Sequence, residues 1–225
     1  MTIEKFRPEL LGYVDGLHFH TLCEQDAQPL HDTLKEVERQ FGEWLPKMKW
    51  LNFGGGHHIT REGYDIALLE RCICDMKEKY DLEIFLEPGE AVALNAGVLL
   101  TKVEEIVENS IQIAILDTSA ACHMPDVLEM PYRPPLQDGY EAEEKAYTYR
   151  LAGPTCLAGD VIGDYSFAEP LKRGDTLTFE DMAIYTMVKN NTFNGMRLPA
   201  IVLEDKDGEC RVVRQFVYED FKMRL

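Results

Sequence analysis

The stretch Leu86-Glu87-Pro88-Gly89-Glu90 follows a short apolar run, 82–86, and puts an acid at the point where a buried strand must turn. We expect Glu87 to be the last extended residue, Pro88 to block a helix, and Gly89 to permit an unusual φ. A strand end of this kind presents a carboxylate to a site. The same tripeptide is also common as a plain acidic turn, so the segments on either side must decide between the two.

The composition indicates a globular protein with a sizeable core. The chain has 225 residues, of which 45% are hydrophobic and 10% aromatic, enough for one large domain or two small ones. No apolar run is long enough to span a membrane, and the N-terminal residues are too charged for a signal peptide. We therefore expect a cytoplasmic protein.

Charge and cysteine usage narrow the choice of partners. The net charge of −17 argues against nucleic acid, because phosphate binding needs a basic face, whereas a cationic partner remains open. A plain acidic protein, kept dispersed by its charge, is the alternative. The six cysteines are scattered without a CxxC pair, which fits a reducing compartment.

The first half of the chain alternates strand and helix. Strands are predicted at 14–20, 50–53 and 83–86, and amphipathic helices at 28–45 and 61–80. This rhythm is typical of a parallel sheet or a (β/α) barrel.

The sequence after Glu90 is mostly strand-forming, with a proline-rich middle at 124–140. Predicted strands lie at 91–103, 111–117, 148–152, 176–179, 200–204 and 211–216. The fold class is therefore α/β plus all-β, with a partial barrel at 1–118 and a β-rich C-terminal domain at 119–225.

Glycines and histidines mark a candidate binding site in the first half. Gly54-Gly55-Gly56 lies between a strand and a helix, where backbone N–H groups can hold a phosphate, although a flexible turn is an equal alternative. His18 and His20 share one face of a strand. They could bind a metal with His57 or His58. No Glu or Cys has a recognisable ligand spacing to them, so we expect no zinc site.

Two segments of the second half also carry chemistry. The loop 153–160 (GPTCLAGD) holds one thiol, Cys156, and one carboxylate, Asp160; such a thiol can donate a proton or can be an inert core residue. Residues 180–186 predict a helix start, from which Tyr185 could reach a phosphate.

The order of these motifs resembles the pyridoxal-phosphate decarboxylases of the alanine-racemase-like fold, which include ornithine, diaminopimelate and biosynthetic arginine decarboxylases. Within that group, three segments look most like the carboxynorspermidine (carboxyspermidine) decarboxylases, and the resemblance covers essentially the whole chain. They are 18–24 (HFHTLCE), 52–58 (NFGGGHH) and 153–160.

The resemblance implies a role for each matching residue. His20 would stack on the pyridine ring of pyridoxal 5'-phosphate, and Glu87 would keep the ring nitrogen protonated. Cys156, offered across a head-to-tail homodimer, would act as the proton donor, with Asp160 beside it on the amine side of the substrate. The phosphate would be held by Gly54, Gly55, Gly56 and Tyr185.

Glu90 departs from the wider group, which has arginine at this position. An acid in place of a base weakens phosphate binding and makes room for a cation. Together with Asp126, Glu90 could bind the ammonium groups of a polyamine substrate, which suits carboxynorspermidine better than a short amino acid.

The Schiff-base lysine of the resembled family is the second departure. It lies on an early barrel strand, and no lysine here stands in that motif, so we expect a C-terminal portion with very poor turnover alone and an unpaired sheet edge. A non-catalytic fragment or pseudoenzyme acting as a dimerisation partner is therefore the first alternative. A diaminopimelate- or ornithine-type amino-acid decarboxylase is the second.

Overall fold

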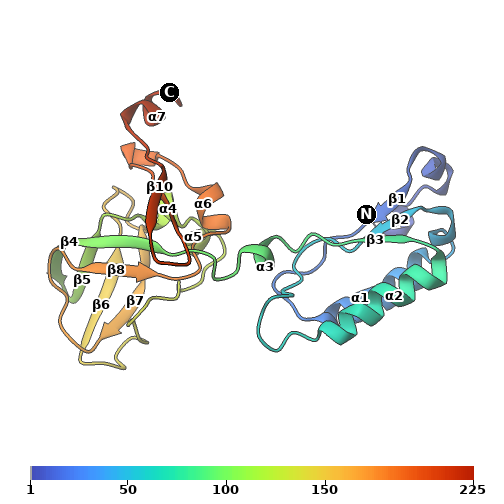
Figure 1. Cartoon of the computed structure of the whole chain (residues 1–225), viewed down its shortest axis with the longest axis horizontal. Helices are drawn as coiled ribbons and strands as arrows, with labels where there is room; N and C mark the ends of the chain where they lie inside the picture. The colour runs from blue at the N-terminus through green and yellow to red at the C-terminus, as the bar shows by residue number, and fades with distance from the viewer. Residues whose placement is uncertain (1) are drawn as a thin grey trace. The chain divides into compact units, whose positions relative to one another are not determined.

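The computed structural model describes residues 2–225, which form two compact units, each with its own buried core. Unit 1 ends at Leu94 and unit 2 begins at Asn95 (Figure 1). The predicted boundary after residue 118 therefore lies inside unit 2. The strands at 99–109 and 111–116 form a sheet with later strands, and this pairing assigns them to unit 2.

Unit 1 is a three-stranded parallel sheet, in the order β1-β2-β3, with two longer helices. Its elements are the 3₁₀ helices Ile3–Lys5 and Pro8–Tyr13, β1 (Gly16–His18), α1 (Ala27–Phe41), the 3₁₀ helix Leu45–Lys47, β2 (Trp50–Asn52), α2 (Ile66–Tyr80), β3 (Glu83–Phe85) and α3 (Gly89–Ala93). Strand and helix alternate as the sequence predicts. Figure 1 shows α1 and α2 side by side along the sheet. Within the described residues, β1 and β3 each pair with β2 alone and form the two edges.

The core of unit 1 lies between the sheet and these helices. Leu51 of β2 is buried with Leu30 and Leu34 of α1 and with Leu69 and Met76 of α2. The apolar residues spaced for one helical face therefore point into the core, where their burial supplies most of the stability of the helices.

Asp26 connects the starts of the two helices. Its Oδ1 atom accepts hydrogen bonds from the backbone N–H of Ala27, at 2.7 Å, and of Asp65, at 3.0 Å. Asp65 in turn caps α2 by accepting from the N–H of Leu68 at 2.9 Å. These bonds occupy N–H groups that have no partner inside a helix, and they bring the two helix starts together.

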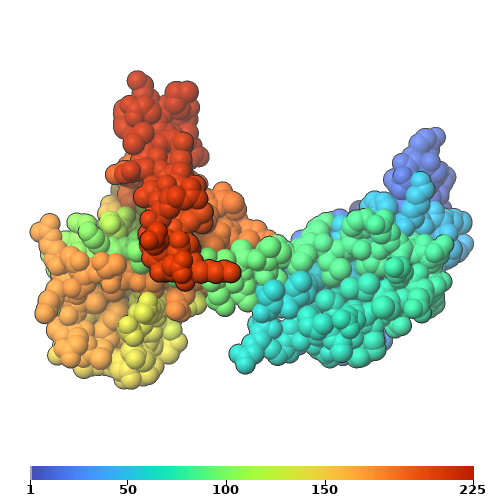
Figure 2. Space-filling view, in the orientation of Figure 1, coloured from blue at the N-terminus to red at the C-terminus, as the bar shows by residue number. Residues whose placement is uncertain are grey.

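Unit 2 is built around a five-stranded sheet with the order β7-β6-β5-β4-β8, in which only β5 and β6 are parallel. Its elements are β4 (Leu99–Asn109), β5 (Ile111–Leu116), α4 (Ala120–His123), α5 (Asp126–Glu129), β6 (Tyr147–Ala152), β7 (Val161–Phe167), β8 (Thr176–Phe179), α6 (Tyr185–Lys189), the 3₁₀ helix Phe193–Gly195, β9 (Ile201–Glu204), β10 (Cys210–Arg214) and α7 (Tyr218–Lys222). The antiparallel pair β9–β10 forms a separate two-stranded sheet. Figure 2 shows this C-terminal segment, in red, projecting from the body of unit 2.

The structure corrects two predictions near Glu90. The segment 91–103 is not extended throughout, because α3 forms at Gly89–Ala93 and the strand begins only at Leu99. Gly89 is the first residue of α3 and has no positive φ, so the unusual conformation expected of it is not present. The Oγ1 atom of Thr60 donates to the carbonyl oxygen of Ala91 at 2.6 Å and ties this short helix to the loop before α2.

Strand β7 was not predicted. Gly163 and Asp164 interrupt its apolar pattern, and both residue types are depleted in strands. Its pairing with β6 compensates, since Arg150 lies opposite Asp164 and donates to both carboxylate oxygens, at 2.8 and 2.9 Å.

No helix within residues 2–225 is long and apolar enough to cross a membrane.

His123 is buried in unit 2 and is held by two backbone groups. Its Nδ1 atom accepts from the N–H of Ser119 at 3.2 Å, and its Nε2 atom lies 3.0 Å from the carbonyl oxygen of Arg197. An acceptor at Nδ1 and a donor at Nε2 describe a neutral imidazole. Burial lowers the pKa of His123 below its usual value.

We expect unit 2 to lose stability in mild acid. Because the folded pKa of His123 lies below the unfolded value of about 6.5, the unfolded chain binds its proton at the higher pH. The free energy of unfolding therefore falls as the pH drops below about 6.5, by up to about 1.4 kcal/mol per pH unit, until the folded pKa is reached. Urea unfolding with pulsed hydrogen exchange in peptides from β5 and β6 measures this slope.

The variant His123→Asn should flatten the slope even if it lowers the absolute stability. His123 is the only histidine in the sequence of unit 2, so no other imidazole there titrates in this range. The matched control His31→Asn, in unit 1, should leave the slope of unit 2 unchanged. An equal slope in wild type and His123→Asn would contradict the prediction.

Candidate functional site

Three chain segments lie together at the carboxyl ends of the parallel strands in unit 1. His18, Asn52 and Phe85 are register partners at the carboxyl ends of β1, β2 and β3. Since parallel strands all run in one direction, the segments that follow them emerge together. These segments carry His20, the glycines 54–56 and Glu87, so the first group of predicted site residues meets here.

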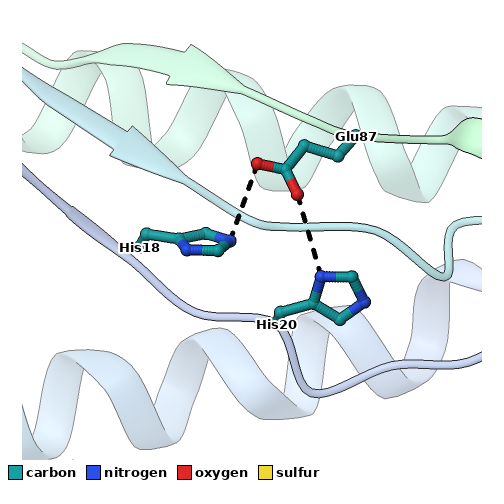
Figure 3. Close-up of side chains that lie close together, drawn as sticks. All are labelled: His18, His20 and Glu87. Atoms are coloured by element: carbon teal, nitrogen blue, oxygen red, sulfur yellow. Dashed lines mark ion pairs between the residues drawn. The ribbon is translucent and has the colours of Figure 1, made fainter.

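Glu87 lies between two imidazoles (Figure 3). Its Oε1 atom is 3.7 Å from Nε2 of His18, and its Oε2 atom is 3.7 Å from Nδ1 of His20. All three side chains are about half exposed to solvent. The carboxylate is accessible and has one imidazole facing each oxygen, and its presentation to a binding site stays a prediction.

Asn52 orients the carboxylate of Glu87, a role that the sequence did not predict. Its Nδ2 donates to Oε1 of Glu87 at 2.7 Å, and its Oδ1 accepts from the N–H of Gly54 at 2.8 Å. The backbone N–H of Glu87 also donates to the carbonyl oxygen of Gly54 at 2.9 Å. The available signal was the position of Asn52 at the end of a predicted strand, two residues before the first glycine.

The glycine loop packs tightly against the chain that follows β1. Gly54 and Gly56 have positive φ, and a Cβ atom would lie 2.4 Å from the carbonyl oxygen of Phe19 or 2.2 Å from that of Leu22, respectively. A Cβ on Gly55 would lie 2.9 Å from Cε1 of His20. All three glycines are therefore needed for close approach.

The sequence placed the glycine loop between a strand and a helix, but in the structure the loop does not lead directly into a helix. Helix α2 begins at Ile66, ten positions after Gly56, so the glycines do not form the N-terminus of α2. In addition, the N–H of Gly54 is bonded to Asn52, and that of Gly55 donates to Nδ1 of His20 at 3.4 Å. Any anion at this loop would compete with these internal bonds.

Glu90 lies in the first turn of α3, three positions after Glu87. Its Oε1 atom is 3.6 Å from Nε2 of His58, whose side chain is largely buried. The carboxylate of Glu90 therefore faces an imidazole of its own unit. His58 is a further residue that the sequence did not connect with Glu90.

The second group of predicted residues lies in unit 2 and centres on Asp160, which is buried. Oδ1 of Asp160 accepts from Oγ of Ser119 at 2.9 Å and from the N–H of Ala121 at 3.2 Å. Its Oδ2 accepts from Oγ1 of Thr155 at 2.6 Å. The carboxylate thus joins the loop 153–160 to the start of α4. Its expected contact with a substrate amine stays a prediction, and its observed partners are internal.

The same loop presents Cys156 to solvent. The loop closes on itself, since the N–H of Gly153 donates to the carbonyl oxygen of Asp160 at 2.8 Å, and a Cβ on Gly153 would lie 2.2 Å from the Asp160 carboxylate. Cys156 is exposed and is one residue away from Thr155. The accessible thiol on a fixed loop is compatible with proton donation.

Asp126 and Tyr185 also lie in unit 2 and share a neighbour. The ammonium group of Lys189 binds Asp126 and lies 3.4 Å from a carboxylate oxygen of Glu129. The same group lies 5.8 Å from the ring centre of Tyr185, which is exposed. The carboxylate proposed for a substrate ammonium thus already binds one ammonium. The contact of Tyr185 with a phosphate stays a prediction.

The structure corrects the reason for expecting no metal site. The sequence showed no acid at a ligand spacing from His18 and His20, but Glu87 is brought to both by the fold. Ligand atoms of the three residues all lie within 4.8 Å of one another.

Comparison with known proteins identifies the family. The family model described as "Pyridoxal-dependent decarboxylase, C-terminal sheet domain" matches residues 15–183. The carboxynorspermidine/carboxyspermidine decarboxylase of Campylobacter jejuni is 45% identical, over 95% of this chain and 59% of the relative. The carboxyaminopropylagmatine decarboxylase of Synechocystis sp. is also 45% identical, over 94% of this chain and 55% of the relative. The chain thus spans somewhat more than half the length of these relatives.

Solved structures give the same grouping. The carboxynorspermidine decarboxylase of Campylobacter jejuni, complexed with norspermidine, matches all of this chain and 64% of its own chain, with a TM-score of 0.92 and 44% identity. A diaminopimelate decarboxylase matches 93% of this chain with a TM-score of 0.75, and at 21% identity it shows a shared fold only. The match of the family model over most of the chain, together with these relatives, shows that the chain belongs to the pyridoxal-dependent decarboxylases.

Proposed function

We propose that this chain is part of a pyridoxal-phosphate-dependent decarboxylase that converts carboxynorspermidine or carboxyspermidine to the polyamine. The observation that carries the proposal is the meeting of His20, Glu87 and the glycine loop 54–56 in a chain 45% identical to such a decarboxylase. We further propose that unit 1 is part of a (β/α) barrel, which its parallel strands and covering helices support.

The residues present fit the aromatic ring of the cofactor. Glu87 offers an accessible carboxylate for a pyridinium N–H, and His20 offers a half-exposed imidazole beside it. Gly55 leaves open the space that a Cβ would fill next to His20 and Glu87. Gly54, Gly55 and Gly56 would hold the phosphate, although the first two N–H groups would have to exchange internal bonds. Tyr185, which belongs to unit 2, would offer its hydroxyl to a phosphate.

The cofactor, when bound, supplies an electron-accepting ring for the electron pair left by departing CO₂. Glu87 would hold the proton on the ring nitrogen, and Asn52 would keep the carboxylate in position through its hydrogen bond to Oε1. His20 would pack against the ring and exclude water from one face. The Schiff-base lysine of the family is not among the residues that we assign.

Cys156 would donate the proton that replaces the carboxyl group. Its exposure on a loop fixed by Asp160 supports this role, and Asp160 would also lie on the amine side of the substrate. In a head-to-tail homodimer the thiol would serve the site of the partner subunit. The exposed apolar side chains of β9 and β10 support association with another chain. They are Val202, Leu203, Val212 and Val213.

The substrate would be a polycation that carries an amino-acid carboxyl group. Glu90 and Asp126 would bind its ammonium groups, and the binding of Lys189 by Asp126 supports the suitability of that carboxylate for an ammonium ion. The net charge of −17 favours such a substrate. The same composition, with its scattered cysteines, supports a cytoplasmic location.

The proposal is tested by CO₂ release from protein purified from its source cell. We expect a higher kcat/KM for carboxynorspermidine and carboxyspermidine than for carboxyaminopropylagmatine, diaminopimelate or ornithine. Fastest release from diaminopimelate or ornithine would favour an amino-acid decarboxylase. Release from none of them, by protein that binds pyridoxal phosphate, would favour a non-catalytic dimerisation partner.

Replacement of Glu87 should affect the chemical step. In Glu87→Gln the ring nitrogen would lose its anionic partner, and we expect kcat to fall by about 100- to 1000-fold. The matched control is Glu83→Gln, an exposed acid at the start of β3, the strand that precedes Glu87, and it should keep the wild-type kcat. Equal kcat values for the two variants would remove Glu87 from the role of ring partner.

Replacement of Glu90 should affect the substrate and not the cofactor. Loss of one charged hydrogen bond to an ammonium group costs about 1.5–3 kcal/mol, so Glu90→Gln should raise KM for the polyamine about 10- to 100-fold. The dissociation constant of pyridoxal phosphate should change far less. Substrate affinity equal to that of the wild type would place Glu90 outside the binding site, with a role limited to its pairing with His58.

A further inference from the structure

His18, His20 and Glu87 have the donor set of a transition-metal site. Two imidazole nitrogens and one carboxylate oxygen lie within 4.8 Å of one another. Three protein ligands of these types, with a fourth position open, are a recurrent arrangement around zinc. Figure 3 shows the two rings converging on the carboxylate from one side of the sheet edge.

The three ligand atoms lie farther apart than they would around a bound zinc ion. With bonds of about 2.0–2.2 Å and tetrahedral angles, neighbouring ligand atoms lie about 3.3–3.5 Å apart. Oε1 of Glu87 is 3.7 Å from Nε2 of His18 and Oε2 is 3.7 Å from Nδ1 of His20, and one ligand atom from each residue lies within 4.8 Å of the others. The three side chains would therefore have to rotate so that their ligand atoms draw together by up to about 1.4 Å.

The backbone and one neighbour hold the three ligands in place. His18 ends β1, and the N–H of Phe19 donates to the carbonyl oxygen of Asn52 at 3.1 Å, which fixes the chain between the two histidines. Asn52 also donates to Oε1 of Glu87 at 2.7 Å. Partners of this kind, which orient a ligand without touching the metal, commonly change metal affinity about 10- to 100-fold.

One internal contact competes with the metal. The N–H of Gly55 donates to Nδ1 of His20 at 3.4 Å. At 3.4 Å between two nitrogen atoms this hydrogen bond is long and weak, so its loss costs little. A metal ion would replace it with a coordinate bond to the same nitrogen.

We propose that His18, His20 and Glu87 bind one Zn²⁺ ion when the ring of the cofactor is absent, leaving the fourth position to water. The site lies wholly within unit 1. Metal and cofactor would exclude each other because both use Glu87 and His20, and zinc would therefore compete with loading of the cofactor. This competition alone rests on the proposed function.

The test measures zinc binding by isothermal titration calorimetry at about pH 7.5. Wild-type chain without cofactor should show a site that is weakened at least about tenfold in His18→Gln and in Glu87→Gln. The matched control is His31→Gln, a partly exposed histidine 3.6 Å from Asp32 on α1, which should retain the site. Circular dichroism verifies that each variant is folded.

Cobalt provides a second readout that the exposed cysteines do not confuse. Thiolates and imidazoles give different visible spectra with Co²⁺. A nitrogen–oxygen spectrum that disappears in His18→Gln therefore reports this site rather than the exposed cysteines Cys23, Cys74, Cys156 and Cys210. Zinc affinity and cobalt spectra unchanged in both His18→Gln and Glu87→Gln would overturn the proposal.

Addition of pyridoxal phosphate separates this proposal from the proposed function. Zinc affinity that falls as the cofactor concentration rises supports one shared site. If the three-ligand site is present but pyridoxal phosphate leaves zinc binding unchanged, the metal site stands and the assignment of the cofactor to Glu87 fails.

Discussion

Parallel pairing of β1, β2 and β3 is the constraint on which the candidate site depends. The register places His18, Asn52 and Phe85 side by side, so that residues shortly after each strand share one edge. No sequence motif joins His20 to Glu87, which are 67 positions apart; only the common direction and register of the strands bring them together. A shift of one residue in the register of a strand would turn the side chains of that strand, such as His18 or Asn52, to the opposite face of the sheet. The site is therefore as well defined as the sheet register that builds it.

In unit 2, segments that are distant in the sequence are brought together by one side chain rather than by the register of a sheet. The buried carboxylate of Asp160 accepts bonds from Ser119, Ala121 and Thr155 and thereby joins two loops that are distant in sequence. Leaving such a carboxylate without partners in the interior would be very costly, so the loops must close around it. Cys156 owes its fixed backbone to this arrangement. Asp160, for which the family resemblance implies a contact with the substrate, thus also holds the two loops together.

The sequence predicted the parts of the molecule that depend on local chemistry. Apolar spacing located α1 and α2, and the order of the motifs pointed to the correct family. It failed where distant contacts decide. Residues 89–93 form a helix because of their neighbours, including Thr60, and β7 forms despite Gly163 and Asp164 because Arg150 lies opposite. Asn52 had no recognisable motif, since its importance comes from a hydrogen bond spanning 35 positions.

Glu87 shows why a group of donors does not by itself specify a ligand. A pyridinium N–H needs one carboxylate oxygen and leaves His18 unused, whereas a divalent metal needs the carboxylate and both imidazoles. The two ligands therefore differ most in their demand on His18, which is not assigned a role with the cofactor. A side chain that one ligand requires and the other ignores makes the two occupants separable. Under the two proposals Glu87 would contact either ligand, whereas His18 would contact only the metal.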